Sequence, residues 1–192
     1  MKVRKAEIGT NAAVVVMGVC GVGKSLLAGR LSQALGVGMV EADDFHNEES
    51  KRKMLAGVAL TEADRMPWLD AVAAAALRRI STTGIAVVAC SALRRVYRER
   101  LNKALPGCVF IHLTGPEALI EDRLNNRKGH FVGKALLGSQ LETLEPLEET
   151  EPGFTLDISL PIDTLVAEAM DHLRQFGLSA ETAVGKRNGT TT

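Results

Sequence analysis

The fold of this chain is decided by the stretch Val14-Val15-Val16-Met17-Gly18-Val19-Cys20-Gly21-Val22-Gly23-Lys24-Ser25. A β-branched run that predicts a strand leads into glycines, and the residues that follow are good helix formers. Gly18, Gly23, Lys24 and Ser25 match G-x-x-x-x-G-K-[ST], the pattern of a phosphate-binding loop. Because the strand before and the helix after are both visible, we favour this interpretation over a glycine-rich turn with a chance lysine.

Each part of this loop has a physical role toward the phosphates of a nucleotide. The glycines let the backbone curl so that N–H groups point at phosphate oxygens, and the helix adds its N-terminal partial positive charge. Lys24 would reach the β- and γ-phosphates, and the Ser25 hydroxyl would ligate Mg²⁺. We therefore expect nucleotide contacts from Gly18, Val19, Cys20, Gly21, Val22, Gly23, Lys24, Ser25 and Leu26.

The composition is that of an ordinary globular domain. The 192 residues suit one domain with a substantial core, and 46% of them are hydrophobic against 24% charged. Lys+Arg and Asp+Glu number 23 each, so the net charge of zero gives no electrostatic argument for nucleic acid or a membrane surface as partner. A small anionic ligand can still be held by local basic groups.

The cysteines and the chain ends favour a cytoplasmic protein. The chain has three cysteines, Cys20, Cys90 and Cys108, and their odd number argues against a disulfide framework. Their spacing does not match that of a zinc site. Residues 1–10 lack the apolar centre of a signal peptide, and no run approaches transmembrane length. We expect residues 1–178 to form the domain and the Gly- and Thr-rich residues 179–192 to be a disordered tail.

Short apolar runs alternate with helical patterns along the chain. We expect strands at residues 12–17, 37–42, 85–89, 109–113 and 156–158. We expect helices at residues 24–35, 48–56, 63–80, 94–104, 117–127, 135–144 and 162–176. The strands are nearly continuous in apolar residues, so the alternation predicts a parallel, doubly wound α/β sheet. Ligands of such sheets bind at the carboxyl ends of the strands.

An acidic loop, Glu41-Ala42-Asp43-Asp44-Phe45-His46, follows the second expected strand. Two acids and the histidine of this loop could orient a substrate hydroxyl, take its proton, or hold Mg²⁺ through water. The alternative is a solvated loop in which Asp44 caps a helix. Beside a phosphate-binding loop we assign Asp43 a functional role, and we leave His46 open between a ligand and a structural residue.

The start of the third expected helix carries one candidate ligand among structural residues. Thr61 or Asp64 can cap this helix, and Pro67 suits its first turn. Trp68 is expected to anchor the helix in the core. Arg65 is assigned a function, because a forked guanidinium beside an acidic loop is suited to gripping a substrate carboxylate.

The third strand ends in Cys90-Ser91, where many phosphate-loop NTPases place a metal-holding Asp. This absence assigns the metal to Ser25, Asp43 and water, and Cys90 is expected to be a small buried residue. Arg94 lies nearest the strand end and could touch substrate. Arg98, one helical turn later, is expected to be a solvated or salt-bridged surface charge.

Arg123 and Arg127 share a helix face just before the glycine-hinged segment Lys128-Gly129-His130-Phe131-Val132-Gly133. This arrangement predicts a lid over the phosphates, at about residues 127–146. The alternative is an exposed helix end whose basic residues complement the macrodipole. His130 could touch phosphate or substrate.

Together these residues resemble the gluconate kinases of bacterial type, a P-loop family within the nucleoside-monophosphate-kinase-like group. The matching segments follow one another in unbroken order over about residues 14–160. They are Gly18–Ser25, Asp43-x-x-His46, Lys53-Met54-x-x-Gly57, Leu60-x-x-x-Asp64-Arg65-x-Pro67-Trp68-Leu69, Cys90-Ser91-Ala92-Leu93-Arg94-x-x-Tyr97-Arg98, Arg127-Lys128-Gly129-His130-Phe131 and Ser139-Gln140-Leu141-Glu142-Thr143-Leu144-Glu145-Pro146.

The resemblance implies a homodimeric kinase that phosphorylates D-gluconate at its 6-hydroxyl with ATP and Mg²⁺. It implies a three-layer sandwich around a five-stranded parallel sheet, the P-loop NTPase fold, with a helical lid. Lys24, Asp43 and Arg127 would be catalytic, with Asp43 taking the proton of the attacking hydroxyl. The gluconate pocket would contain Asp43, His46, Arg65, Arg94 and His130. Arg123 and Arg127 would face the nucleotide, and Pro161 would border the adenine.

Four residues depart from the family pattern. Asn47 and Gly133 stand where the family commonly has proline, Ser50 where it has asparagine, and Ala59 where it has proline. They cluster on the substrate side, so ATP as the phosphoryl donor is better supported than gluconate as the acceptor. Two alternatives therefore stay open: a same-fold kinase for a shikimate-like or other sugar acid, and a non-catalytic nucleotide-binding module. A GTPase is excluded, because no guanine-reading Asn-Lys-x-Asp is present.

Overall fold

A parallel sheet of five strands forms the centre of the computed structural model, which describes residues 11–126 and 133–184. Its strands are β1 (Ala12–Met17), β2 (Met39–Glu41), β3 (Ile85–Ala89), β4 (Cys108–Thr114) and β5 (Gly153–Asp157). The spatial order is β2-β3-β1-β4-β5, and each neighbouring pair is parallel. The chain therefore leaves the central β1 first toward one edge and then toward the other, which confirms the doubly wound sheet.

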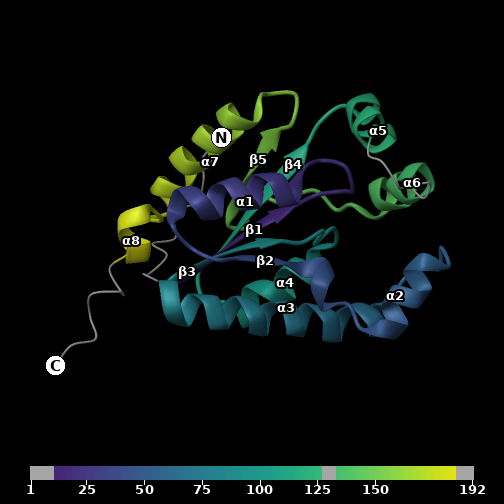
Figure 1. Ribbon diagram of the computed structural model, residues 1–192, viewed down its shortest axis with the longest axis horizontal. Helices are drawn as coiled ribbons and strands as arrows, with labels where there is room; N and C mark the ends of the chain where they lie inside the picture. The colour runs from purple at the N-terminus through teal and green to yellow at the C-terminus, as the bar shows by residue number, and fades with distance from the viewer. Residues whose placement is uncertain (1–10, 127–132, 185–192) are drawn as a thin grey trace.

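Helices cover both faces of this sheet and so make three layers (Figure 1). They are α1 (Lys24–Leu35), α2 (Glu48–Leu55), α3 (Glu62–Thr83), α4 (Arg95–Ala104), α5 (Glu117–Asn125), α6 (Gly133–Thr143), α7 (Ile162–Gln175) and α8 (Ala180–Val184), with a 3₁₀ turn, η1, at Ala42–Phe45. One face carries α1, α7 and α8, and the opposite face carries α3 and α4 (Figure 1).

The pleat of β1 divides the core into two halves. Successive side chains of a strand point to opposite faces, and in β1 all of them are buried. Val14 and Val16 pack in the half beneath α1 and α7, whereas Val15 and Met17 pack against the residues of α3 and α4. Burial on both faces explains why this strand is apolar without alternation.

The parallel sheet brings the loops after its strands to one edge. There α2, α5 and α6 lie away from the two helical layers (Figure 1). The loop after β1 contains Gly18 to Gly23, and η1 follows β2 directly. The loop after β3 joins this edge through the Gly18 amide, which donates to the Ser91 carbonyl oxygen at 3.2 Å. Residues far apart in sequence thus meet where a ligand of this fold class binds.

Three expectations about local structure are wrong. Residues 180–184 form α8 and bury Ala183, so this part of the expected tail is ordered by apolar contact. Pro67 lies in the second turn of α3, because the helix already begins at Glu62. The last strand begins at Gly153, earlier than residue 156, since an edge strand alternates in burial and lacks the continuous apolar run.

Candidate active site

Backbone conformation and close packing explain the glycines of the phosphate-binding loop. Gly18, Gly21 and Gly23 have φ angles of 138°, 82° and 98°, a region that glycine enters without steric cost. A Cβ atom on Gly18 would lie 2.7 Å from the Leu113 carbonyl oxygen, and one on Gly21 would lie 2.8 Å from Cγ of Leu124. Left-handed residues at these intervals are typical of a backbone nest, which gathers N–H groups for an anion.

The side chains of the loop divide between packing and chemistry. Val19 and Val22 are buried in the core, so only their backbone can face a ligand, and Leu26 is exposed. The Lys24 ammonium donates to the Val19 carbonyl oxygen at 2.9 Å. Burial lowers the pKa of Lys24, and the nearby Asp43 is the largest influence that opposes this shift. Lys24 is thus a cation held inside the loop, within electrostatic reach of the acidic turn after β2.

Helix α6 touches the loop through Gln140. Its side-chain oxygen accepts a hydrogen bond from the backbone N–H of Cys20 at 2.6 Å. This N–H belongs to the loop expected to bind phosphate, so Gln140 places the oxygen of an amide where an anionic oxygen could bind. The sequence pattern alone does not single out Gln140, although this residue belongs to the segment Ser139–Pro146 that carries the family resemblance.

Glu41 is a second residue that the sequence pattern does not single out. It is the last residue of β2, and burial raises its pKa, with further increases from Asp43 and Asp44. Hydrogen bonding from the Ser25 hydroxyl and the charge of Lys24 oppose this rise. The sequence feature that identifies Glu41 is an acidic residue at the end of an apolar strand, but two aspartates follow it closely and are more conspicuous.

Oxygen ligands for Mg²⁺ gather between these elements. Ser25, Glu41 and Asp43 offer a hydroxyl and two carboxylates, the donor types that Mg²⁺ prefers. Among the described residues, no group of three or more His, Cys, Asp or Glu side chains could hold a metal by itself. This sparse set fits Mg²⁺ that is bound mainly by phosphates and water.

Asp43 and His46 lie together on the turn after β2. Asp43 is exposed, and its Oδ1 lies 3.9 Å from His46 Nε2. His46 is buried and stacks on Trp68, whose indole N–H donates to the Ala42 carbonyl oxygen at 2.7 Å. Burial lowers the pKa of His46 against the opposing effect of Asp43, so the imidazole is neutral at pH 7. Its buried Nδ1 has no hydrogen-bond partner among the described residues.

The two arginines predicted to bind substrate meet at one aromatic ring. The guanidinium of Arg65 lies 5.8 Å from the ring centroid of Tyr97, and that of Arg94 lies 5.7 Å from it. Arg94 also forms ion pairs with Glu62 and, at 3.7 Å, with Glu145. Residues from α3 and from the start of α4 thus form one basic cluster, in which carboxylates offset part of the charge of Arg94.

Arg123 links two loops at the carboxyl edge of the sheet. Its guanidinium donates to the Ile158 carbonyl oxygen at 2.8 Å and to the Val22 carbonyl oxygen at 3.4 Å. Pro161 is the N-cap residue of α7, three positions after Ile158. Arg127 and His130 lie outside the described residues, so their predicted contacts remain predictions.

Two of the family departures form one local structure. The Asn47 side chain accepts a hydrogen bond from the Ser50 N–H at 2.7 Å and caps α2. Ser50 is buried, whereas Ala59 lies in an exposed loop. Gly133 is the first residue of α6. The departures at 47 and 50 therefore supply a helix cap, and neither adds a charge to the site.

Known proteins resemble this chain over most of its length. No family model matches it. A thermoresistant gluconokinase of Escherichia coli is 36% identical over 162 residues, 84% of this chain and 93% of that protein. A probable gluconokinase of Dictyostelium discoideum is 35% identical over 171 residues, 84% of this chain and 86% of that protein.

Solved structures show the same similarity. A sugar kinase of Janibacter sp. superimposes with a TM-score of 0.82 and 39% identity, covering 90% of this chain and 98% of that one. A gluconokinase of Sinorhizobium meliloti gives 0.76 and 36%, covering 95% and 99%. An APS kinase of Mycobacterium tuberculosis, at 0.63 and 20% identity, covers 85% and 98% and shares the P-loop kinase fold alone.

Proposed function

This chain belongs to the gluconokinase family, and from this premise we propose that it transfers the γ-phosphoryl group of ATP to the 6-hydroxyl of D-gluconate. One observation carries the proposal beyond the family membership. The loop cation Lys24 and the acidic residue Asp43 follow different strands, yet they lie within electrostatic reach of each other at the carboxyl edge of the sheet. A phosphoryl donor and an acceptor hydroxyl held by these two groups would lie side by side.

The nucleotide would lie along the phosphate-binding loop. Its phosphates would accept hydrogen bonds from the loop amides, and Lys24 would exchange the Val19 carbonyl for a phosphate oxygen. Arg123 and the loop ending in Pro161 would border the base. Ser25 would ligate Mg²⁺, with Asp43 and Glu41 holding its water ligands. When bound, Mg²⁺ supplies neutralisation of phosphate charge.

The sugar acid would bind between the acidic turn and the arginine cluster. Arg65 and Arg94 would hold its carboxylate, and His46 and, from the lid side, His130 would bind its hydroxyl groups. The Asp43 carboxylate would accept the proton of the 6-hydroxyl as that oxygen bonds to the γ-phosphorus and ADP leaves. Arg127 would neutralise charge on the transferring group.

A coupled ADP-release assay over a panel of acids tests this proposal. We expect turnover with gluconate, and we expect Asp43→Asn to lower kcat about 10²–10⁴-fold, as loss of a general base does. Good turnover with shikimate or another sugar acid, and none with gluconate, would replace the substrate but keep the kinase. Binding of ATP without turnover of any acid would indicate the non-catalytic module.

We also propose that residues 127–146 act as a lid and that the enzyme is a cytoplasmic homodimer. The Gln140 contact with Cys20 supports the first proposal, because it places α6 on the phosphate-binding loop. Three free thiols support a reducing compartment. In the described part of the chain, no helix has the length and apolarity needed to cross a membrane. Sedimentation equilibrium measures the oligomeric state directly.

A further inference from the structure

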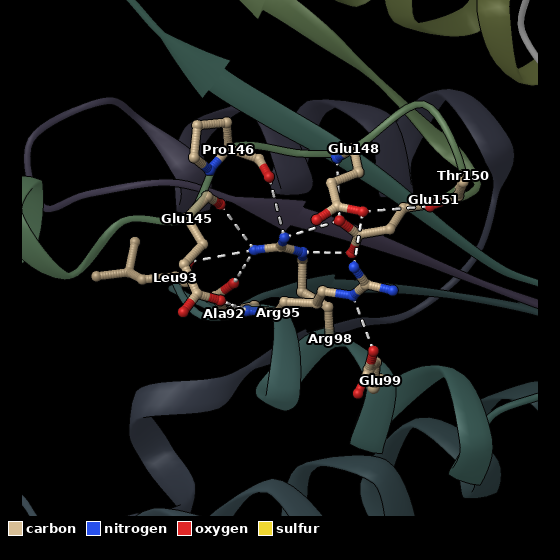
Figure 2. A network of polar contacts seen from close by, with 10 residues as sticks. All are labelled: Ala92, Leu93, Arg95, Arg98, Glu99, Glu145, Pro146, Glu148, Thr150 and Glu151. Carbon is tan, nitrogen blue, oxygen red and sulfur yellow. Dashed lines mark hydrogen bonds and ion pairs between the residues drawn. The ribbon is translucent and has the colours of Figure 1, made fainter.

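Arg98, expected on the surface, is completely buried at the centre of a polar network (Figure 2). Its guanidinium makes six hydrogen bonds. Two reach the carboxylate of Glu151 at 2.6 and 2.8 Å, and the others reach the carbonyl oxygens of Ala92, Leu93, Glu145 and Pro146. This residue therefore joins segments that are about fifty positions apart in sequence.

The charge of Arg98 is compensated where it is buried. Burial alone would raise the pKa of Glu151, but hydrogen bonds from Arg98 and from the Glu148 amide outweigh it and lower the pKa. Arg100, two residues later on α4, instead forms an exposed bidentate pair with Asp70 at 2.7 and 2.6 Å. Because buried ion pairs contribute little net stability, stability alone does not explain why Arg98 is buried.

The network holds the chain after α6 against the start of α4. The Glu145 amide donates to the Leu93 carbonyl oxygen at 2.9 Å, and the Glu145 carboxylate accepts from the Arg95 amide. Arg95 pairs with Glu148 at 2.7 Å. Residues 145–151 thus form a strap over the loop that follows β3, with Arg98 beneath it (Figure 2).

That loop contains an unusual backbone conformation. Ala92 has a φ of 42°, and among the described residues no other non-glycine residue has a positive φ. Its carbonyl oxygen accepts from Arg98 at 3.4 Å. On one side of it the Ser91 carbonyl accepts a hydrogen bond from the Gly18 amide of the phosphate-binding loop, and on the other side Arg94 occupies the N-cap position of α4 without a side-chain capping bond. The turn at Ala92 therefore sets the direction in which Arg94 leaves the sheet.

We propose that Arg98 is a positioning residue for the acceptor substrate: it holds the turn at Ala92 so that Arg94 faces the sugar acid. This inference rests on the proposed function, in which Arg94 binds the substrate carboxylate. The same guanidinium fixes the strap that returns from α6, whose Gln140 touches the phosphate-binding loop. Arg98 thereby links the substrate side of the site to the element nearest the phosphates.

Steady-state kinetics of Arg98→Lys test the proposal, with Arg100→Lys as the matched control. Lysine keeps the charge but cannot reach the carboxylate and the four carbonyl oxygens together. We expect the KM for gluconate to rise about tenfold while the KM for ATP stays within about twofold, and Arg100→Lys to change neither. Equal loss toward both substrates, or an unchanged gluconate KM in a folded variant, would overturn the proposal.

Ala92→Gly provides a rescue that a merely structural role would not give. Glycine adopts a positive φ without strain, so the turn no longer depends on Arg98. We expect Ala92→Gly, added to Arg98→Lys, to reverse most of the rise in the KM for gluconate. A KM that stays raised in the double variant would contradict the proposal. If Arg98→Lys does not fold, Glu151→Gln, which keeps the arginine, replaces it. This variant should raise the KM for gluconate by a smaller factor and leave the KM for ATP unchanged. An unchanged KM for gluconate would overturn the proposal.

The wild-type enzyme separates this inference from the proposed function in the same assay. Absence of gluconate turnover in the wild type would refute the function itself. If another sugar acid is the acceptor, the kinetics are measured with that acid. Arg98→Lys must then raise the KM for that acid and leave the KM for ATP unchanged.

Discussion

The imidazole of His46 lies parallel to the indole of Trp68, with ring centroids 4.5 Å apart and an interplanar angle of 9°. The indole N–H also donates to the Ala42 carbonyl oxygen at 2.7 Å, one residue before Asp43. Trp68 therefore supports both the imidazole and the turn that carries the proposed base. As the single tryptophan of the chain, it also reports on this turn by fluorescence.

The fluorescence of Trp68 should follow the protonation of His46. Burial lowers the pKa of His46 from 6.5, so a protonated imidazole should quench the stacked indole only below pH 6.5. The unfolded chain binds this proton more readily, so the free energy of unfolding should fall as the pH drops below 6.5. A pH titration of native fluorescence measures the midpoint, and His46→Gln should remove the transition. A midpoint above 6.5 would contradict this account.

Gly18→Ala and Gly23→Ala should differ in their effect on stability. Both positions have positive φ, but only the Cβ of residue 18 would meet a backbone atom, the Leu113 carbonyl oxygen at 2.7 Å. We expect a loss of about 1 kcal/mol in the free energy of unfolding for Gly23→Ala and about 3 kcal/mol for Gly18→Ala. Urea denaturation of the nucleotide-free protein tests this difference, and equal losses would show that only backbone strain matters.

Lys24→Met should separate activity from stability. The half-buried ammonium donates to the Val19 carbonyl oxygen, and its lowered pKa indicates that burial disfavours the charge. Removing it should lower kcat about 10²–10³-fold through lost stabilisation of phosphate charge. The urea midpoint should stay the same or rise, because methionine fills the space without a charge. A variant that loses stability together with activity would show that Lys24 also holds the loop in shape.

Sequence alone could predict the parts of this structure that depend on neighbours in the chain. The strand, glycine loop and helix from Val14 onward are local, and so is the alternation that specifies the sheet. Asp43, Arg65 and Arg94 could be proposed as site residues because their strand ends and helix starts converge in a parallel sheet. Their charges also stand next to the expected ligand edge.

Residues whose role depends on distant segments could not be predicted. Arg98 shares a helix with exposed arginines, and it is buried because residues 145–151, some fifty positions later, return over it. Glu41 differs from a surface acid because β2 ends beside Ser25. Gln140 meets Cys20 across 120 positions. Periodicity cannot identify such contacts, since they follow from packing.

The pKa of Asp64 should be far below that of an ordinary aspartate. Hydrogen bonds from Lys53 and then from the amide and hydroxyl of Thr61 lower it from 3.8 to about 2. The folded-state pKa is depressed, so the stabilisation is present above pH 3.8 and is lost as the pH falls toward 2. NMR titration of the side-chain carboxyl carbon measures this pKa. Lys53→Met should raise it, whereas Lys51→Met, on the same helix, should not.

The thiols should differ in reactivity, and nucleotide should protect one of them. Burial raises the pKa of Cys90 to about 12 and raises that of Cys108 as well, so neither should react in the native protein. Cys20 is partly exposed; burial raises its pKa, and the charge of Lys24 and a backbone hydrogen bond oppose the rise. A disulfide reagent should therefore modify Cys20 alone, faster at higher pH, and all three thiols in urea.

Because Cys20 lies in the phosphate-binding loop, Mg-ATP should block the native reaction and Cys20→Ser should abolish it. A native rate that ATP leaves unchanged would place the nucleotide elsewhere.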